Sequence, residues 1–100
     1  MNAAEMASLL RDCDAELVCV GHTHCPFEHR AGGVHVVNPG AVSLSVTEDK
    51  SASYALLDAG ESEYSLQHCS VSYDRAKVID QLNRMRHPGR GYLVKHLSDQ

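Results

Sequence analysis

The sequence predicts an α/β fold with mostly antiparallel strands and two or three helices. Three observations carry this prediction: a short unbroken apolar run, two pairs of strand-like segments that turn at glycine, and helical apolar spacing near both ends. With 100 residues, the chain is one domain or part of one. The segments concerned are 17–20, then 27–30 with 34–37, then 53–57 with 64–73, and the helical segments 3–13 and 74–85.

The first helix and the first strand are predicted from the order of apolar residues. Residues 3–13 place them at a broadly helical spacing, and Asn2 stands where it can cap the start of a helix. The unbroken apolar run at residues 17–20 ends at Gly21. A short continuous run after a helix predicts a strand that is buried on both faces of a sheet.

A β-hairpin is predicted next. Residues 27–30 and 34–37 are joined through Gly32 and Gly33, a dipeptide that tolerates the positive φ angles of tight hairpin turns. Asn38-Pro39-Gly40 then breaks the second strand, because proline lacks the N–H that a strand ladder needs. A loop of defined shape is expected there.

A second antiparallel pair is predicted from residues 53–57 and 64–73, which turn around Gly60. The apolar positions of the second segment change phase between Leu66 and Cys69, which predicts a bulge or a sharp twist.

The last part of the chain predicts a helix that begins after Asp74, a good N-cap, with Tyr73 placed to pack onto Val78. Residues 87–89, His-Pro-Gly, end this helix, and residues 91–97 form a closing helical turn or a strand. The apolar stripe of the helix comprises Val78, Ile79, Leu82 and Met85.

Composition excludes several classes of protein. The chain is 43% hydrophobic and 22% charged, which is typical of a globular protein and not of a disordered one. Its net charge of -4 is spread without a basic stripe, so nucleic acid is not expected as a bulk electrostatic partner. The start has no basic region and no apolar run reaches about 18 residues, so we expect a cytoplasmic protein without a membrane partner. Four cysteines without a C-x-x-C pair predict neither a disulfide framework nor a zinc ribbon.

The segment Gly21-His22-Thr23-His24 is the candidate functional site, because it stands where a buried strand ends. In an extended backbone, His22 and His24 project to the same side with their Cα atoms about 6 to 7 Å apart. Imidazoles bind Zn, Mn, Fe, Co and Ni, and catalytic metal pairs lie about 3.5 to 4 Å apart. Each histidine is thus a candidate ligand of one ion. An H-x-H pair taken without context is equally typical of a polar surface.

These residues carry a resemblance. The segment 21–24 followed by Pro26, together with Asn38-Pro39-Gly40-Ala41-Val42, resembles the last conserved block of the calcineurin-like metallophosphoesterases, specifically their small bacterial and archaeal phosphodiesterase branch. The similarity runs from residue 14 to residue 42. It implies the C-terminal part of a metallophosphoesterase β-sandwich flanked by helices, with residues 1–100 forming the C-terminal portion of one domain. It also implies that His22 binds one divalent metal ion and His24 the other, and that residues 38–40 are structural.

The motifs that precede this block in the family are missing here. An Asp-x-His, a Gly-Asp, a Gly-Asn-His and a further histidine do not precede residue 21, and the upstream residues are too few for a βαβ unit of about 30 residues. Zinc sites take three or four protein ligands, so we expect weak or no metal binding, no catalytic residue within this chain and negligible hydrolysis by the chain alone. The resemblance implies that the complete parent is a hydrolase of small phosphate esters, a phosphodiesterase with two metal ions.

Two other interpretations stay open at this stage. His22, His24 and Glu28 match part of the single-metal pattern of cupin barrels, although Glu16 and His35 stand where that pattern has glycine. Alternatively, the chain is a metal-free phosphoesterase-fold scaffold that binds partner proteins.

The remaining histidines and cysteines are interpreted as surface, sheet or packing residues, with Cys25 as a weaker candidate ligand. A strand at residues 17–20 without a neighbour on one side also predicts self-association, as a homo-oligomer or an aggregate. The residues concerned are His29, His35, His68, His87 and His96, and Cys13, Cys19 and Cys69.

Overall fold

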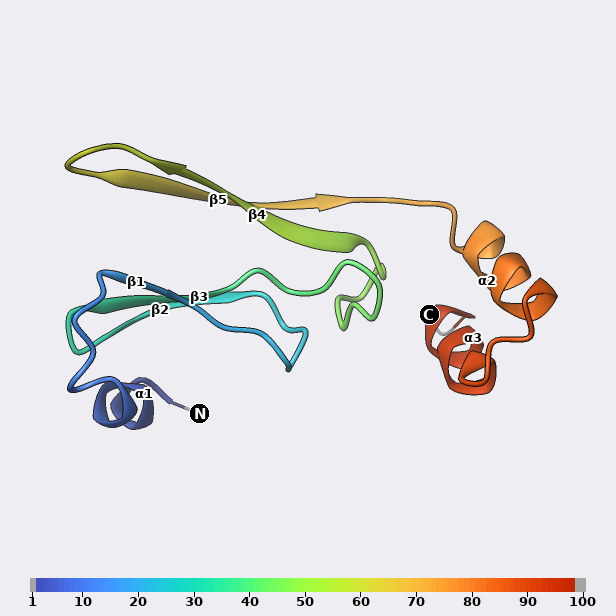
Figure 1. Ribbon diagram of the computed structural model, residues 1–100, viewed down its shortest axis with the longest axis horizontal. Helices are drawn as coiled ribbons and strands as arrows, with labels where there is room; N and C mark the ends of the chain where they lie inside the picture. Colours follow the sequence, from blue (N-terminus) through green and yellow to red (C-terminus); the bar gives the residue numbers. More distant parts are fainter. Residues whose placement is uncertain (1, 99–100) are drawn as a thin grey trace.

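A computed structural model of the protein describes residues 2–98 and has the predicted α/β architecture (Figure 1). The molecule is elongated, with extents of 48 × 28 × 22 Å. Its elements are, in chain order, α1 (Ala3–Leu9), β1 (Leu17–Cys19), β2 (Phe27–Ala31), β3 (Val34–Asn38), β4 (Ala52–Ala59), β5 (Tyr64–Val71), α2 (Arg75–Arg84) and α3 (Arg90–Ser98).

The first sheet has three strands in the order β1-β3-β2. Strand β1 runs parallel to β3, whereas β2 and β3 form the predicted antiparallel hairpin. Gly32 and Gly33 make its turn with φ angles of 59° and 83°, the left-handed region that glycine enters without a Cβ penalty. The hairpin predicted from the glycine pair is therefore confirmed.

Helix α1 covers one face of this sheet, and the hairpin of β4 and β5 lies over the other face (Figure 1). The helix begins at a capping box in which the side chain of Asn2 accepts a hydrogen bond from the amide of Glu5, and the Glu5 side chain accepts one from the amide of Asn2. A small apolar core forms beneath the helix. Its buried members are Met6, Ala31, Val34 and Val36, with Ala7, Leu10, Val18 and Phe27 packed against them.

Strand β1 is not buried on both faces, as its apolar run alone predicts, but is exposed at an edge, as predicted for residues 17–20 without a neighbour on one side. Within β1, Leu17 and Val18 are half-buried and Cys19 is exposed, and Val20 after it is 37% exposed. The strand is the edge of the three-stranded sheet, since it pairs with β3 alone among the described residues. An apolar run of this kind indicates that a strand can be buried, but it does not indicate which elements cover the strand.

The second sheet consists of β4 and β5, which pair from Ala52 opposite Val71 to Ala59 opposite Tyr64. This register is continuous, so the predicted bulge between Leu66 and Cys69 is wrong. The phase change has a different origin. Leu66 shares the face of Tyr64, which bonds to the first sheet, whereas Cys69 and Val71 alternate onto the opposite face.

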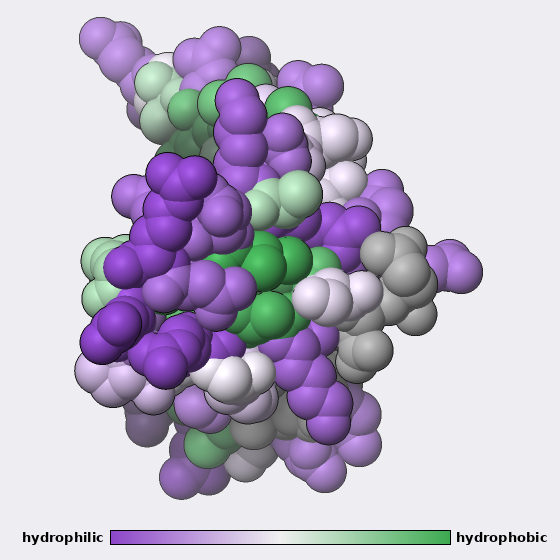
Figure 2. All heavy atoms as spheres, turned by 90° about the vertical axis from the view of Figure 1, so that its right-hand side faces the viewer, coloured by the Kyte–Doolittle hydropathy of each residue, from purple (hydrophilic) through white to green (hydrophobic). Residues whose placement is uncertain are grey.

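Helices α2 and α3 form a separate pair at the far end of the molecule (Figure 1). Asp74 caps α2 as predicted, since its side chain accepts a hydrogen bond from the amide of Lys77. The closing segment is a helix, α3, and not a strand. Figure 2 views this end of the molecule and shows apolar surface in its middle, bordered by hydrophilic side chains. No helix within residues 2–98 has the length and apolarity that crossing a membrane requires.

Candidate metal centre

The loop that carries the two candidate ligands follows β1 directly. The amide of Val20 donates to the carbonyl oxygen of Val37 at 2.8 Å, which extends the pairing of β1 with β3 by one bond. The chain then turns, and the amide of Thr23 donates to the carbonyl oxygen of Gly21 at 2.9 Å. The sheet thus places the loop at the end of β1, the edge at which α/β sheets hold ligands.

The backbone of this loop is not extended. His22 has a φ of 74° and His24 a φ of 63°, so both residues adopt the left-handed conformation. That conformation costs an L-residue about 1 to 2 kcal/mol, and residues held in it gather at functional sites. The estimate of a 6 to 7 Å spacing from extended geometry therefore does not apply, because the loop is a turn and not a continuation of the strand.

Asn38, the last residue of β3, holds the loop in this shape. Its side chain is fully buried, and its Nδ2 donates to the Thr23 hydroxyl at 3.1 Å and to the carbonyl oxygen of Gly21 at 3.4 Å. Its Oδ1 accepts from the amide of Gly40 at 2.9 Å. One side chain thus links the loop after β1 to the turn after β3.

The His24 ring has a defined tautomer in its neutral form. Its Nδ1 lies 2.9 Å from the carbonyl oxygen of Leu44, and a carbonyl oxygen only accepts, so Nδ1 carries a proton. The lone pair of the neutral ring is therefore on Nε2. A metal-ligating histidine commonly donates its other N–H to a carbonyl oxygen in this way. The half-buried His24 thus fits a metal ion through Nε2, whereas His22 is exposed.

The described part of the chain holds no complete set of metal donors. Within residues 2–98, no three His, Cys, Asp or Glu side chains are grouped so that they could hold an ion. Glu28 bonds instead to His35 on the neighbouring strand, and the described strands form two separate sheets and not one barrel, which contradicts the cupin-like interpretation. Cys25 is exposed, and its thiol lies 4.0 Å from the carbonyl oxygen of Pro26. Two imidazoles fit a divalent ion chemically, but a structural or catalytic zinc site takes three or four protein ligands.

A sequence model of the calcineurin-like phosphoesterase superfamily domain matches residues 2–62, which is more than half of the chain. The chain belongs to this superfamily. The family predicted from the segments around residues 21–24 and 38–42 is thus confirmed, and membership supports a metal-dependent phosphoesterase at the superfamily level. No curated protein has a significant match to the sequence.

Several solved structures share the fold of this chain over part of their own length. A metallophosphoesterase from Sphaerobacter thermophilus is 26% identical, with a TM-score of 0.79 over 97% of this chain and 48% of that one. A hypothetical protein from Pyrococcus horikoshii is 20% identical, with a TM-score of 0.79 over 97% of this chain and 37% of that one. A conserved uncharacterized protein from Streptococcus pneumoniae, described as a predicted phosphoesterase, is 20% identical with a TM-score of 0.56 over 69% and 40%. This phosphoesterase chain spans less than half the length of these structures.

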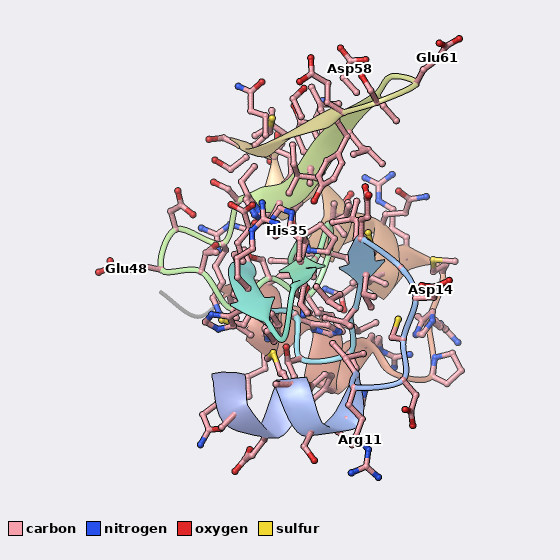
Figure 3. The ribbon with its side chains drawn as sticks, turned by 90° about the vertical axis from the view of Figure 1, so that its left-hand side faces the viewer. Arg11, Asp14, His35, Glu48, Asp58 and Glu61 are labelled. Atoms are coloured by element: carbon pink, nitrogen blue, oxygen red, sulfur yellow. The ribbon has the colours of Figure 1, made fainter. Side chains whose placement is uncertain are left out.

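The phosphoesterase domain also holds a polar cluster between its two sheets, where Figure 3 shows His35. The His35 residue is 7% exposed. Its Nε2 lies 2.7 Å from Oε1 of Glu28, and its Nδ1 lies 2.6 Å from the hydroxyl of Tyr64. Because the carboxylate accepts from Nε2–H, Nδ1 of the neutral ring accepts from the tyrosine. Nε2 of His68 stands 3.6 Å from Oε2 of the same glutamate.

The sequence predicts His35 and His68 as surface or sheet residues, and both lie in strands, but it does not predict that they come together. The members of this cluster come from β2, β3 and β5, and the His35 and Tyr64 partners are 29 residues apart. The available signal was the apolar surroundings of His35 in β3, where it stands among valines that are all buried. A cleft of about 520 Å³ opens beside the cluster, with Arg30 and Glu63 among its lining residues.

Proposed function

We propose that this chain supplies the loop of His22 and His24 to the two-metal centre of a phosphoesterase that hydrolyses phosphodiesters of small molecules. The remaining ligands come from polypeptide outside these 100 residues. One observation carries the proposal: in a chain of this superfamily, the His24 ring donates from Nδ1 to a backbone carbonyl and keeps Nε2 for an ion.

The chemistry expected of the chain follows from these two rings. Divalent ions of the Mn, Zn, Fe, Co or Ni type, when bound, supply positive charge that polarises the phosphoryl group. His22 and His24 each offer one imidazole, and Asn38 keeps their loop in its turned shape. The chain has no further grouped donors among its described residues, so we expect it to bind metal weakly by itself and to be inactive alone.

Exposed thiols and an exposed strand edge support the expected compartment and the expected self-association. Cys13, Cys19 and Cys25 are free, exposed thiols, which supports a reducing compartment such as the cytoplasm. The exposed edge of β1 supports self-association of the chain in isolation.

A chimera tests the activity. Residues 2–98 would replace the superposed part of the Sphaerobacter thermophilus metallophosphoesterase, and hydrolysis of bis(p-nitrophenyl) phosphate with Mn²⁺ would be measured. We expect turnover by the chimera and a fall in kcat/KM of more than about tenfold for His24→Gln, since even groups that only orient a ligand are worth about 10- to 100-fold. The matched control is His29→Gln, which changes an exposed histidine on β2.

Two outcomes would contradict the proposal. The first is a folded, Mn²⁺-loaded chimera that is inactive while the parent enzyme turns over. The second is an active chimera that tolerates both His22→Gln and His24→Gln as well as it tolerates His29→Gln. Turnover by the 100-residue chain alone would contradict the expectation that its donor set is partial.

A further inference from the structure

We propose that His96 on α3 is a positioning residue for His24 and acts through the peptide segment of Leu44 and Ser45. The inference rests on the proposed function in one respect, namely that His24 is a metal ligand. It adds a residue from the last helix, 72 positions along the chain from His24, to the set that shapes the candidate metal centre.

Two successive carbonyl groups are held by two imidazoles. The carbonyl oxygen of Leu44 lies 2.9 Å from Nδ1 of His24, and that of Ser45 lies 3.0 Å from Nε2 of His96. Both carbonyls can only accept, so each ring donates an N–H. The acceptor that fixes the tautomer of His24 is therefore itself held by a side chain from α3.

Helix α3 is anchored firmly enough to act as a support. Leu97, next to His96, is 4% exposed and lines an apolar hollow of about 470 Å³ together with Val42 and Leu44. Arg75 of α2 donates from Nη1 to the carbonyl oxygen of Leu97 at 2.7 Å, which satisfies a free acceptor at the end of α3. The last helix is thus fixed both to α2 and to the segment that follows β3.

The held segment has little freedom of its own. Ser45 is 1% exposed, and its hydroxyl lies 2.7 Å from that of Thr47. The amide of Thr47 also donates to the Ser45 hydroxyl at 3.2 Å. A peptide that is held by its own turn and by His96 presents the Leu44 carbonyl in one orientation. Without that orientation, the His24 proton can move to Nε2, the nitrogen that an ion needs.

The experiment reads the tautomer of each histidine from long-range ¹H–¹⁵N NMR spectra of the metal-free, full 100-residue chain. We expect the neutral His24 ring to carry its proton on Nδ1 in the unmodified protein. His96→Leu should convert it to a mixture of tautomers, whereas His96→Gln, which keeps an N–H donor, should restore the Nδ1–H form. The ring of His35 is an internal control for folding, because Glu28 and Tyr64 hold it independently of α3.

A Zn²⁺ titration of the same variants, made in the chimera with the Sphaerobacter thermophilus enzyme, separates this inference from the proposed function. His96→Leu should weaken Zn²⁺ binding at His24 about 10- to 100-fold, the usual effect of losing a group that orients a ligand. An unchanged His24 tautomer in a His96→Leu chain with an unchanged His35 ring overturns the inference, whatever the zinc affinity. A changed tautomer in a chain whose zinc binding does not depend on His24 overturns the proposed function and leaves the link between His96 and His24 standing.

Discussion

Gly40 lies in the turn after β3, against Ser53 of the second sheet, and replacing it by alanine tests how that turn is held. Its φ is 89°, a conformation that costs an L-residue about 1 to 2 kcal/mol. A Cβ atom there would lie 2.7 Å from Cβ of Ser53 and 3.3 Å from Cδ of Pro26. Forcing a methyl group into a packed site costs a further 1 to 3 kcal/mol or so.

The alanine also stiffens the unfolded chain, which returns about 0.4 to 1 kcal/mol. We therefore expect Gly40→Ala to lower the free energy of unfolding by about 1 to 4.5 kcal/mol, which is the sum of the strain and overpacking terms less this gain. Urea denaturation followed by circular dichroism measures this as a shift of the midpoint at an unchanged m-value. Because the Gly40 amide donates to Asn38, which holds the His22–His24 loop, the amides of that loop should also shift in NMR spectra.

Two other glycines separate strain from steric contact. Gly33 has a φ of 83° but open space around its Cβ position, so Gly33→Ala should cost about 1 kcal/mol, the strain alone less the gain in the unfolded state. Gly21 has open space and no positive φ, so Gly21→Ala should raise stability by about 0.4 to 1 kcal/mol through the unfolded state alone. The reasoning is refuted if Gly40→Ala destabilises the chain no more than Gly33→Ala does.

Four further outcomes are expected. Asn38→Ala should lower the free energy of unfolding by about 2 to 4 kcal/mol in a urea titration, since it removes three hydrogen bonds of a fully buried side chain; a loss below that of Gly33→Ala would contradict this role. Tyr64→Phe should lower the free energy of unfolding by about 1 to 3 kcal/mol, because it leaves Nδ1 of the buried His35 without the hydroxyl group that lies 2.6 Å away. The backbone N–H of Ser51 lowers the pKa of Asp49 below its ordinary value of 3.8. Asp49 therefore stabilises the fold above its unfolded-state pKa and loses that contribution as the pH falls through its lower folded-state pKa. The difference in stability between the protein and Asp49→Asn should close in acid, and a difference that does not change with pH would refute this. Val20→Lys should reduce concentration-dependent self-association in sedimentation experiments, because it charges the exposed edge at β1, and unchanged association would point to another surface.

Local signals predicted most of the elements correctly. Asn2 and Asp74 are caps whose chemistry acts within three residues, and both cap the helices that were expected. The Gly32-Gly33 turn likewise depends on backbone angles within the hairpin itself. The family could be recognised for a related reason, since the residues around His22 and His24 are contiguous in the sequence.

Features that depend on distant segments could not be predicted. The phase change in β5 reflects two differently covered faces of one regular strand. The backbone of His22 and His24 was predicted to be extended because the preceding apolar run is a strand. In the structure, contacts with Asn38 hold this loop in a turn. The cluster at His35 and the contact of His96 with Ser45 join residues 29 and 51 positions apart.

The strain in the His22–His24 loop indicates which segments of the chain fix the conformation of the candidate site. Two left-handed residues cost together about 2 to 4 kcal/mol, more than the loop's own hydrogen bond from Thr23 to Gly21 contributes. The compensating bonds come from Asn38 and from the segment at Leu44, both downstream of the loop. The upstream strand therefore sets only the position of the two imidazoles. Their conformation is imposed by later parts of the chain, as far as the last helix.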